Sequence, residues 1–422
     1  MPLGNPFEPN SLVQIADFLV LQKNYSASIY NLVNIKNNKK VHFKVNIGGK
    51  MNLELLNHGF IPEEICYKLP EEFSDVEKLA LELPKVLANE QIEDRVLKLQ
   101  AEKDIDTLTE PQLERAMLIY SYIGHAFMWG KRNDKNVIPL QIAKTWHKIS
   151  TKLERPPILS YASYALNNWK MLDSSQPFDL ENIVITQNFL GGVDEDWFIM
   201  IHVAIEHEAK EILSSLNKYF FDSGDASNLE EAQQSIKKIN NIMNRMPEKC
   251  DPFIYYNRVR PYIFGWKNNP TTPDGVIYEG VEEYNGEPQI FRGETGAQSS
   301  IVPMLDALLG VTHSDDPLKE YLDEMRLYMP KEHRDLLNNL DSWSQTERST
   351  LVDSIDDEDK NLIDEIIKEV HIFRNKHLEY ARIYIYEQSL TNDSNSNIVG
   401  TGGTPFMKYL DKHLQETVPS ND

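Results

Sequence analysis

The sequence predicts an all-α protein with a large C-terminal helical domain and a smaller, mostly helical N-terminal domain. Apolar residues recur at steps of three and four along most of the chain, which is the spacing of one face of an α-helix. Of the 422 residues, 41% are hydrophobic, and 6 Trp, 19 Tyr and 16 Phe supply enough apolar surface for a large core. Strand-like alternation is confined to short runs, so the helical pattern decides the class.

Residues 1–56 are expected to form an N-terminal extension of mixed α and β structure. Within it, residues 12–21 form one amphipathic piece, and the alternating run VHFKVNIGG (41–49) is typical of a strand. The first ten residues, MPLGNPFEPN, contain no basic segment followed by an apolar run, so they do not resemble a secretory signal.

Residues 57–190 are expected to form the small helical domain. Helices are predicted at 77–99 (with a turn near Asn89), 111–130, 139–153 and 158–169. The loop 173–196 is rich in Asp, Ser and Gly and contains the short run IVITQNF. This composition indicates a domain boundary there.

Residues 191–422 are expected to form the large helical domain. Helices are predicted at 196–216 and 228–245, followed by an aromatic segment with an internal proline at 252–266, and again from Ser299 onward. The dipeptide Asn285-Gly286 between two apolar runs predicts a β-hairpin. The polar stretch 389–399 should be mobile.

Composition excludes several classes of function. The net charge of -22, without a basic stripe, argues against binding to nucleic acid or to anionic membranes. Only two cysteines are present and no CxxC motif, which argues against a disulfide framework or a thiolate zinc site. No apolar stretch is long enough to span a membrane. We therefore expect a soluble, cytoplasmic protein.

One histidine, His377, lies on the apolar face of the longest predicted helix, residues 357–388. The face consists of Ile363, Ile366, Val370, Phe373, His377, Tyr380 and Tyr384. A buried imidazole loses hydration unless another group takes its place. A metal or a cofactor iron is one such group and a backbone carbonyl is the other, so an ordinary core histidine remains the alternative.

A second histidine, His202, repeats this pattern on the helix predicted at 196–216, where it shares an apolar stripe with Phe198. His207 lies off the stripe between Glu206 and Glu208, and we expect it in solvent. Two helices that each direct one imidazole inward are typical of cofactor sites in all-α proteins. Haem iron takes a proximal histidine and leaves its opposite side open, but a core histidine is the alternative here too.

Arginines next to these segments suit anionic groups. Arg374 precedes His377 by one turn and could pair with Asp306 or with a cofactor carboxylate. Arg260 lies in FIYYNRVRPYIFGW, where a cation among aromatic rings suits an amino-acid carboxylate, or simply stacks on a ring. The loops GETGAQSS and GTGGT offer backbone N–H groups and hydroxyls but lack the setting of a phosphate-binding loop. The polar stretch before GTGGT suggests a lid over a ligand.

Six segments together carry a family resemblance. They are RPPILSYASYALNNW (155–169), VRPYIFGWKNNP (259–270), FRGETGAQSSIVPMLDALLG (291–310), MRLYMPKEHRDLL (325–337), FRNKHLEYARIYI (373–385) and GTGGTPFMKYL (400–410). In this order they resemble the indoleamine 2,3-dioxygenase family, from about residue 58 to the end of the chain. The first fifty or so residues have no counterpart.

The resemblance implies a haem b (iron protoporphyrin IX) enzyme that inserts dioxygen across the indole C2–C3 bond of L-tryptophan, giving N-formylkynurenine. It implies a monomer or weak homo-oligomer. For the cofactor, the resemblance implies His377 as the proximal iron ligand, and Arg374 with Asp306 as the pair that braces its helix and a haem propionate. For the substrate, it implies Arg260 at the carboxylate and Thr401 near the ammonium. The implied pocket walls are Tyr161, Phe198 and Thr295.

Several residues depart from the family's pattern. His202 stands where the animal enzymes usually have serine, and is similar to the distal histidine of tryptophan 2,3-dioxygenases, which accepts a hydrogen bond from the indole N–H. Tyr164 and Tyr255 occupy pocket positions that are smaller or less polar in the animal enzymes, whereas Ala165 is smaller. Glu294 replaces a frequent glycine. We therefore expect His202 to take part in catalysis with Arg260, and Tyr164 and Tyr255 to contact the substrate.

Three alternatives remain open at this point. The same haem scaffold could perform another reaction on an indole, such as mono-oxygenation or a rearrangement. The protein could instead be a haem-binding sensor or carrier in which His202 ligates the iron. The third alternative is a helical scaffold without a cofactor, which would leave His377, Arg260 and both glycine-rich loops unexplained.

Overall fold

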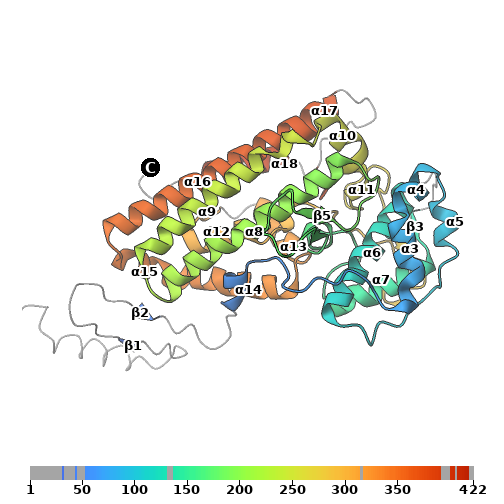
Figure 1. Ribbon diagram of the computed structural model, residues 1–422, viewed down its shortest axis with the longest axis horizontal. Coiled ribbons are helices and arrows are strands. Elements are labelled where there is room, and N and C mark those ends of the chain that lie inside the picture. The colour runs from blue at the N-terminus through green and yellow to red at the C-terminus, as the bar shows by residue number, and fades with distance from the viewer. Residues whose placement is uncertain are drawn as a thin grey trace, which may run out of the picture.

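The structure, a computed structural model, describes residues 31–32, 43–44, 53–130, 136–313, 317–390, 400–403 and 406–417. Helices dominate it, which confirms the predicted all-α class. Three long helices lie side by side: α8 (Val193–Phe221), α9 (Ala226–Asn244) and α16 (Asp357–Ala381), with α9 packed against both others (Figure 1). They form the frame on which the candidate site is built.

A group of shorter helices lies at one end of this frame (Figure 1). In chain order the helices before α8 are α2 (Glu54–His58), which packs against α8 itself, and then η1 (Glu71–Phe73), α3 (Ser74–Leu81), α4 (Leu83–Ala88), α5 (Ile92–Val96), the longer α6 (Glu110–Trp129), α7 (Leu140–Lys152) and η2 (Ala162–Leu166). The helix α6 begins at a capping box in which Thr109 and Gln112 satisfy each other's backbone N–H groups. It is buried along nearly its whole length, so it forms the centre of this group.

Shorter helices also follow α9 and surround the site. They are η3 (Met246–Glu248), α10 (Pro252–Ile254), η4 (Tyr255–Val259), α11 (Arg260–Ile263), η5 (Glu282–Tyr284), η6 (Gly296–Gln298), α12 (Ile301–Leu309), α13 (Pro317–Arg326), α14 (Lys331–Trp343), η7 (Ser344–Arg348), α15 (Ser349–Ser354), η8 (Arg382–Tyr386), α17 (Glu387–Leu390) and α18 (Phe406–Glu416).

The described strands are short and form three two-stranded sheets. The antiparallel pairs are β1 (Asn31–Leu32) with β2 (Phe43–Lys44), and β4 (Trp169–Met171) with β5 (Ile183–Ile185). The parallel pair is β3 (Val137–Ile138) with β6 (Ile277–Tyr278). These sheets tie loops to helices rather than forming a core of their own.

Two predicted helices were wrong in part. The segment 77–99 does not form a helix interrupted only near Asn89, since a further break separates α3 from α4. The turn near Asn89 is confirmed by the positive φ of Glu90, 54°. In the segment 158–169 only η2 is helical, because the N–H groups of Leu159 and Tyr161 donate to the side chains of His125 and Gln298 instead of to helix carbonyls.

The predicted hairpin at Asn285-Gly286 was wrong as well. Both residues have positive φ, 51° and 76°, so the turn exists. The flanking segments nevertheless meet only at one bridge, between Val276 and Gln289, and β6 pairs with β3 instead. Residues 12–21, most of 41–49 and residues 391–399 lie outside the described part, and the domain boundaries at residues 56 and 190 stay predictions.

Two glycines let the site loops approach each other closely. A Cβ atom on Gly265 would lie 2.0 Å from the backbone nitrogen of Gly293. Real atoms cannot come that close, so both loops need glycine at this contact. The contact brings the segment after α11 against the segment before η6, and both segments carry candidate site residues.

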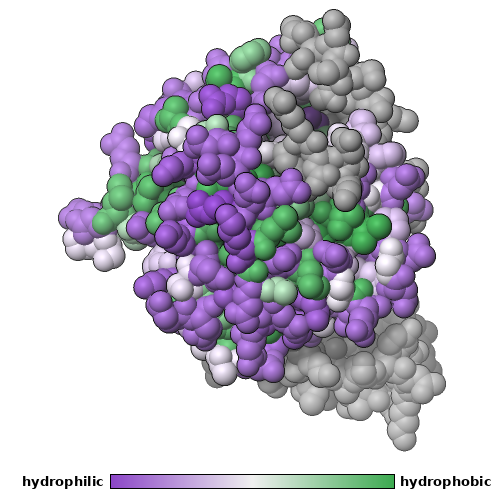
Figure 2. All heavy atoms as spheres, turned by 90° about the vertical axis from the view of Figure 1, so that its right-hand side faces the viewer, coloured by the Kyte–Doolittle hydropathy of each residue, from purple (hydrophilic) through white to green (hydrophobic). Residues whose placement is uncertain are grey.

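The surface at the α3–α7 end is mainly hydrophilic. Figure 2 shows hydrophobic residues there only in small groups among hydrophilic ones. Within the described residues, none of the helices combines the length and the apolar character needed to cross a membrane.

Candidate active site

Five predicted pocket residues come together as one aromatic cluster. Phe198 in α8 lies at its centre, with ring centres 4.5 Å from His202, 4.6 Å from Tyr255 and 6.3 Å from Tyr164. The ring of Tyr161 lies edge-on to His202 at 5.9 Å. These residues come from α8, from the segment around η2 and from η4, so only the tertiary fold assembles them.

The hydrogen bonding of His202 defines its chemistry. Its Nδ1 atom lies 2.8 Å from the carbonyl oxygen of Phe198, one turn earlier in α8, and a nitrogen in that position donates. Burial lowers the pKa of His202, so the ring is neutral near pH 7. A neutral ring that donates through Nδ1 keeps a lone pair on Nε2.

The ring of His377 in α16 is surrounded by protein but not closely packed. Much of its side chain is accessible, yet its surroundings lower its pKa to about 4, mainly by burial and further through His202 and Arg374. The two observations fit a ring that borders a hollow among protein groups. Val370 in α16 and Tyr384 in the following η8 are buried, so the packing opens at His377.

The ring nitrogens of His377 face this space. An ordinary core histidine would donate to a backbone carbonyl. Within the described residues, no protein group hydrogen-bonds to either ring nitrogen of His377. Gly296 lies opposite: a Cβ atom placed on it would meet only the Nε2 atom of His377, at 4.0 Å. A neutral, accessible imidazole nitrogen on an otherwise apolar helix face fits an axial ligand of haem iron.

Behind His377, an ion-pair network joins α16 to α12 and α18. The Nη2 atom of Arg374 lies 2.7 Å from the Oδ2 atom of Asp306, as predicted, and the guanidinium also donates to the Thr417 hydroxyl. His313 bridges two carboxylates: its Nε2 lies 3.1 Å from Asp306 and its Nδ1 2.7 Å from Glu416. Despite its burial, the guanidinium of Arg374 and the hydrogen bond from His313 hold the pKa of Asp306 below its usual value.

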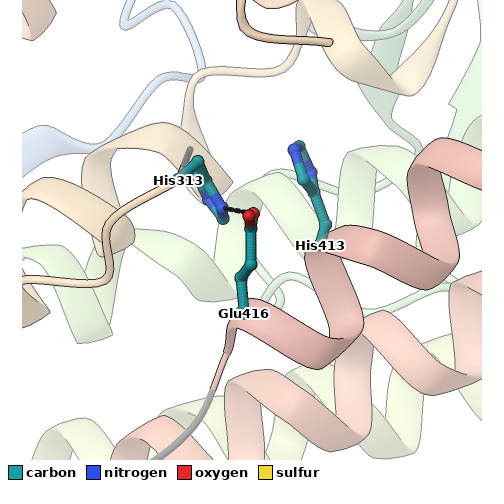
Figure 3. Close-up of side chains that lie close together, drawn as sticks. All are labelled: His313, His413 and Glu416. Carbon is teal, nitrogen blue, oxygen red and sulfur yellow. Dashed lines mark hydrogen bonds and ion pairs between the residues drawn. The ribbon is translucent and has the colours of Figure 1, made fainter. Parts of the chain in front are cut away.

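His313, His413 and Glu416 could in principle hold a metal ion, because their ligand atoms lie within 4.8 Å of one another (Figure 3). Both ring nitrogens of His313, however, face carboxylates. Although burial opposes it, hydrogen bonds with Asp306 and Glu416 raise the pKa of His313. A doubly donating imidazolium has no lone pair for a metal. The cluster is therefore an ion-pair network that holds α18 on α12.

Arg260 is buried, with 4% of its surface exposed, at the start of α11. Its guanidinium carbon lies 5.3 Å from the ring centre of Tyr256 and 5.1 Å from that of Phe264, so the ring stacking given as the alternative does occur. Burial lowers its pKa, and Tyr255 and Tyr256 act in the opposite direction. Arg260 therefore lies close enough to Tyr255, a member of the aromatic cluster, for the two side chains to interact electrostatically.

The glycine-rich segment 400–403 docks onto the site. The Thr401 carbonyl accepts from the N–H of Gly265, and the Thr401 hydroxyl donates to the carbonyl of Glu294. Arg292 donates to the Gly402 carbonyl at 2.6 Å. Thr295, the predicted pocket residue, caps η6 and lies beside Gly402. The predicted lid over residues 389–404 falls largely outside the described residues, since 391–399 and 404 are not among them.

Comparisons with known proteins agree with this geometry. The family model described as indoleamine 2,3-dioxygenase matches residues 55–420. The chain belongs to the indoleamine 2,3-dioxygenase family. Indoleamine 2,3-dioxygenase 1 of Rattus norvegicus is 32% identical over 383 residues, which cover 84% of this chain and 93% of the rat protein. The indoleamine 2,3-dioxygenase of Saccharomyces cerevisiae is 29% identical, over 87% of this chain and 92% of the yeast protein.

A further relative is an indoleamine 2,3-dioxygenase of Aspergillus nanangensis, 26% identical over 85% of this chain and 94% of that protein. The family match begins at residue 55 and therefore leaves out all of the first fifty residues. Membership in the indoleamine 2,3-dioxygenase family makes the protein an oxidoreductase. The roles of individual residues stay predictions.

Sequence reasoning missed Glu206 in this member of the indoleamine 2,3-dioxygenase family. The helix pattern gave no role to Glu206. In the structure Glu206 is 1% exposed, and its Oε1 atom accepts a hydrogen bond from the Ser299 hydroxyl at 2.7 Å. The expectation that His207 lies in solvent was wrong in part, because its ring is half-buried and stacks on Phe178 with ring centres 3.7 Å apart. The i, i+4 spacing of His202 and Glu206 was the available signal, since such residues share a helix face.

His125 in α6 was also missed. Its Nδ1 donates to the Tyr262 carbonyl at 2.7 Å, and its Nε2 accepts from the Leu159 N–H at 3.1 Å. Burial lowers its pKa to about 3, so this ring is neutral. His125 therefore fixes α11, which carries Arg260, against the segment that leads to Tyr161. No short sequence pattern distinguishes such a contact.

Proposed function

We propose that this protein is a haem b dioxygenase that inserts both atoms of dioxygen across the C2–C3 bond of the indole of L-tryptophan, giving N-formylkynurenine. The observation that carries the proposal is the pair of neutral imidazoles, His202 and His377, close enough for His202 to lower the pKa of His377. Family membership supplies the reaction class. A cytoplasmic location and a monomer or weak homo-oligomer belong to the same proposal.

In this proposal His377 holds the cofactor through Nε2, and Arg374, fixed by Asp306, braces the ligand helix and a propionate. The haem iron, when bound, supplies the activation of dioxygen. The protein's own contribution is positioning, which converts an encounter between molecules into a reaction within one site. The apolar walls of Tyr161, Phe198 and Thr295 exclude water.

The remaining residues orient the indole substrate. Arg260 pairs with the carboxylate, Thr401 lies near the ammonium, and the lone pair on His202 Nε2 accepts a hydrogen bond from the indole N–H. That bond fixes which face and which edge of the indole meet the oxygen. Closure of the segment that contains Thr401 completes the pocket.

The test is an absorption spectrum of the purified protein with haem, followed by product mass. We expect a Soret band, and a gain of two oxygen atoms on L-tryptophan under oxygen. His377→Ala should lose haem retention, whereas His207→Ala, outside the site, should keep it. A His377→Ala variant with normal haem content and spectrum would refute the ligand assignment.

The alternative function is a different reaction on an indole substrate. It is favoured by the hydroxyl of Tyr164, which is buried without a hydrogen-bond partner in the described part of the chain. An unsatisfied buried hydroxyl suits a substrate that carries an additional polar group. A mass gain of one oxygen, or of none, would select this alternative. A six-coordinate, low-spin ferrous spectrum would select the sensor, in which His202 ligates the iron.

A further inference from the structure

Glu294, which replaces a frequent family glycine, has a firmly held backbone. Its N–H donates to the carbonyl of Ile263 in α11 at 3.2 Å, and its own carbonyl accepts from the Thr401 hydroxyl. Residue 294 therefore connects the helix of Arg260 with the glycine-rich segment. The residue is 3% exposed, so its side chain must point into the protein.

The carboxyl of Glu294 lies within electrostatic reach of aromatic residues of the candidate site. It contributes to the electrostatics of four tyrosines, namely Tyr122, Tyr161, Tyr164 and Tyr255. Burial alone raises its pKa to about 8. Within the described residues, no cation pairs with this carboxyl and no group donates a hydrogen bond to it. A buried carboxyl left in this state costs free energy, which a bound cation would recover.

Arg260 supplies the complementary charge in the same pocket. The hydroxyl of Tyr255 is affected electrostatically by both Arg260 and Glu294, which places it near the two groups. Among the described residues no ion pair joins Arg260 to Glu294, and burial is the sole cause of the raised pKa of Glu294. One buried cation and one buried carboxyl, kept apart, match the two charges of an α-amino acid zwitterion.

We propose that Glu294 is a specificity-determining residue whose carboxylate pairs with the α-ammonium of the amino-acid substrate, while Arg260 holds the carboxylate. This inference rests on the proposed function, because it assigns a ligand group to the same site. Thr401, the residue expected near the ammonium, hydrogen-bonds to the backbone of Glu294 itself. The site would thus select indoles with an amino group over indoles without one.

The experiment measures dissociation constants of three ligands on the haem-loaded full chain at pH 8 by calorimetry. L-tryptophan carries both charges, tryptamine carries only the ammonium, and indole-3-propionate carries only the carboxylate. Glu294→Gln should weaken L-tryptophan and tryptamine by about 10- to 100-fold, the range for a lost charge-assisted bond. Indole-3-propionate should change by less than about threefold, because no charge pair is lost with it.

Two further variants make the outcome decisive. Glu294→Asp keeps a carboxylate and should retain the preference for ammonium, which a merely structural role would not require. Glu287→Gln, at an exposed position, is the matched control and should change none of the three affinities. Equal weakening of all three ligands by Glu294→Gln, no weakening of any, or no binding of any to the unaltered protein would overturn the inference.

The same data separate this inference from the proposed function. Normal oxidation of L-tryptophan with an unchanged ligand preference in Glu294→Gln removes only the inference. A protein that prefers ammonium ligands through Glu294 but adds no oxygen to any indole removes only the proposed reaction.

Discussion

The Nδ1 atom of His202 lies 2.8 Å from the carbonyl oxygen of Phe198, and this single bond selects the tautomer of a pocket histidine. With the proton on Nδ1, the ring can only accept through Nε2. The same bond keeps the ring on the pocket side of α8, where it meets Tyr161 edge-on. A helix backbone thus prepares His202 to receive an N–H group.

We expect His202→Ala to lower kcat/KM for L-tryptophan by about tenfold or more, the equivalent of one lost hydrogen bond of about 1.4 kcal/mol. 1-Methyl-L-tryptophan has no indole N–H, so its kcat/KM should change much less. Steady-state kinetics with both substrates check this. An equal loss for both would show that His202 acts on the iron or on the pocket shape instead.

Arg260→Gln should raise KM for L-tryptophan by about 10- to 100-fold, because a buried pair with the substrate carboxylate is lost. Tryptamine, which lacks that carboxylate, should bind this variant as well as it binds the unaltered protein. The neighbouring exposed Arg258 offers the control, since Arg258→Gln should leave KM unchanged. If tryptamine suffers equally, Arg260 is structural.

Glu206→Ala should destabilise the fold by about 1 to 3 kcal/mol, because the Ser299 hydroxyl loses its buried acceptor. Glu206→Gln retains an acceptor oxygen and should cost less. Urea denaturation measures both, with Glu211→Ala, an exposed position on the same helix, as the control. Equal stabilities of the Ala and Gln variants would contradict the role of this bond.

Asp306→Ala should cost about 3 to 5 kcal/mol, since it leaves the buried guanidinium of Arg374 without its carboxylate. The comparison is Asp323→Ala, which breaks a surface pair with Lys319 and should cost no more than about 1 kcal/mol. Denaturant unfolding gives both values, and haem retention should fall only in Asp306→Ala. A small cost at Asp306 would mean that His313 and Glu416 hold α12 and α18 without it.

Stability should depend on pH through Glu294. Its pKa is raised from 4.5 to about 8 in the folded protein, so the fold retains a proton that the unfolded chain releases. The resulting stabilisation is complete below pH 4.5 and is lost as pH rises through 8. Glu294→Gln does not titrate, so its stability relative to the unaltered protein should rise by about 1.4 kcal/mol per pH unit between pH 5 and 8.

Denaturation of both proteins at pH 5.5 and 7.5 measures this gap. Glu287→Gln serves as the control, because an exposed carboxyl at that position should produce no pH-dependent difference. A constant gap between Glu294→Gln and the unaltered protein would mean that this carboxyl is ionised in the folded state at pH 5.5.

Most of the long helices could be predicted from the sequence, because apolar spacing and capping residues act locally. The boundaries of α7 and α9 differ from the predicted 139–153 and 228–245 by no more than two residues. Prediction failed where backbone groups bond to distant side chains. The segment after Pro157 donates to His125 and Gln298, and no local pattern reveals those partners.

The helical class, the two inward-facing histidines and the residues of the family motifs follow from residue spacing within single segments, so they could be predicted without a structure. The tertiary fold was needed to find which of these groups lie near one another. It brought His202 toward His377, buried Glu206 under Ser299, and left the buried Glu294 carboxyl without a partner in the described part of the chain. The physical reason is that burial and electrostatic coupling depend on contacts between segments far apart in the chain.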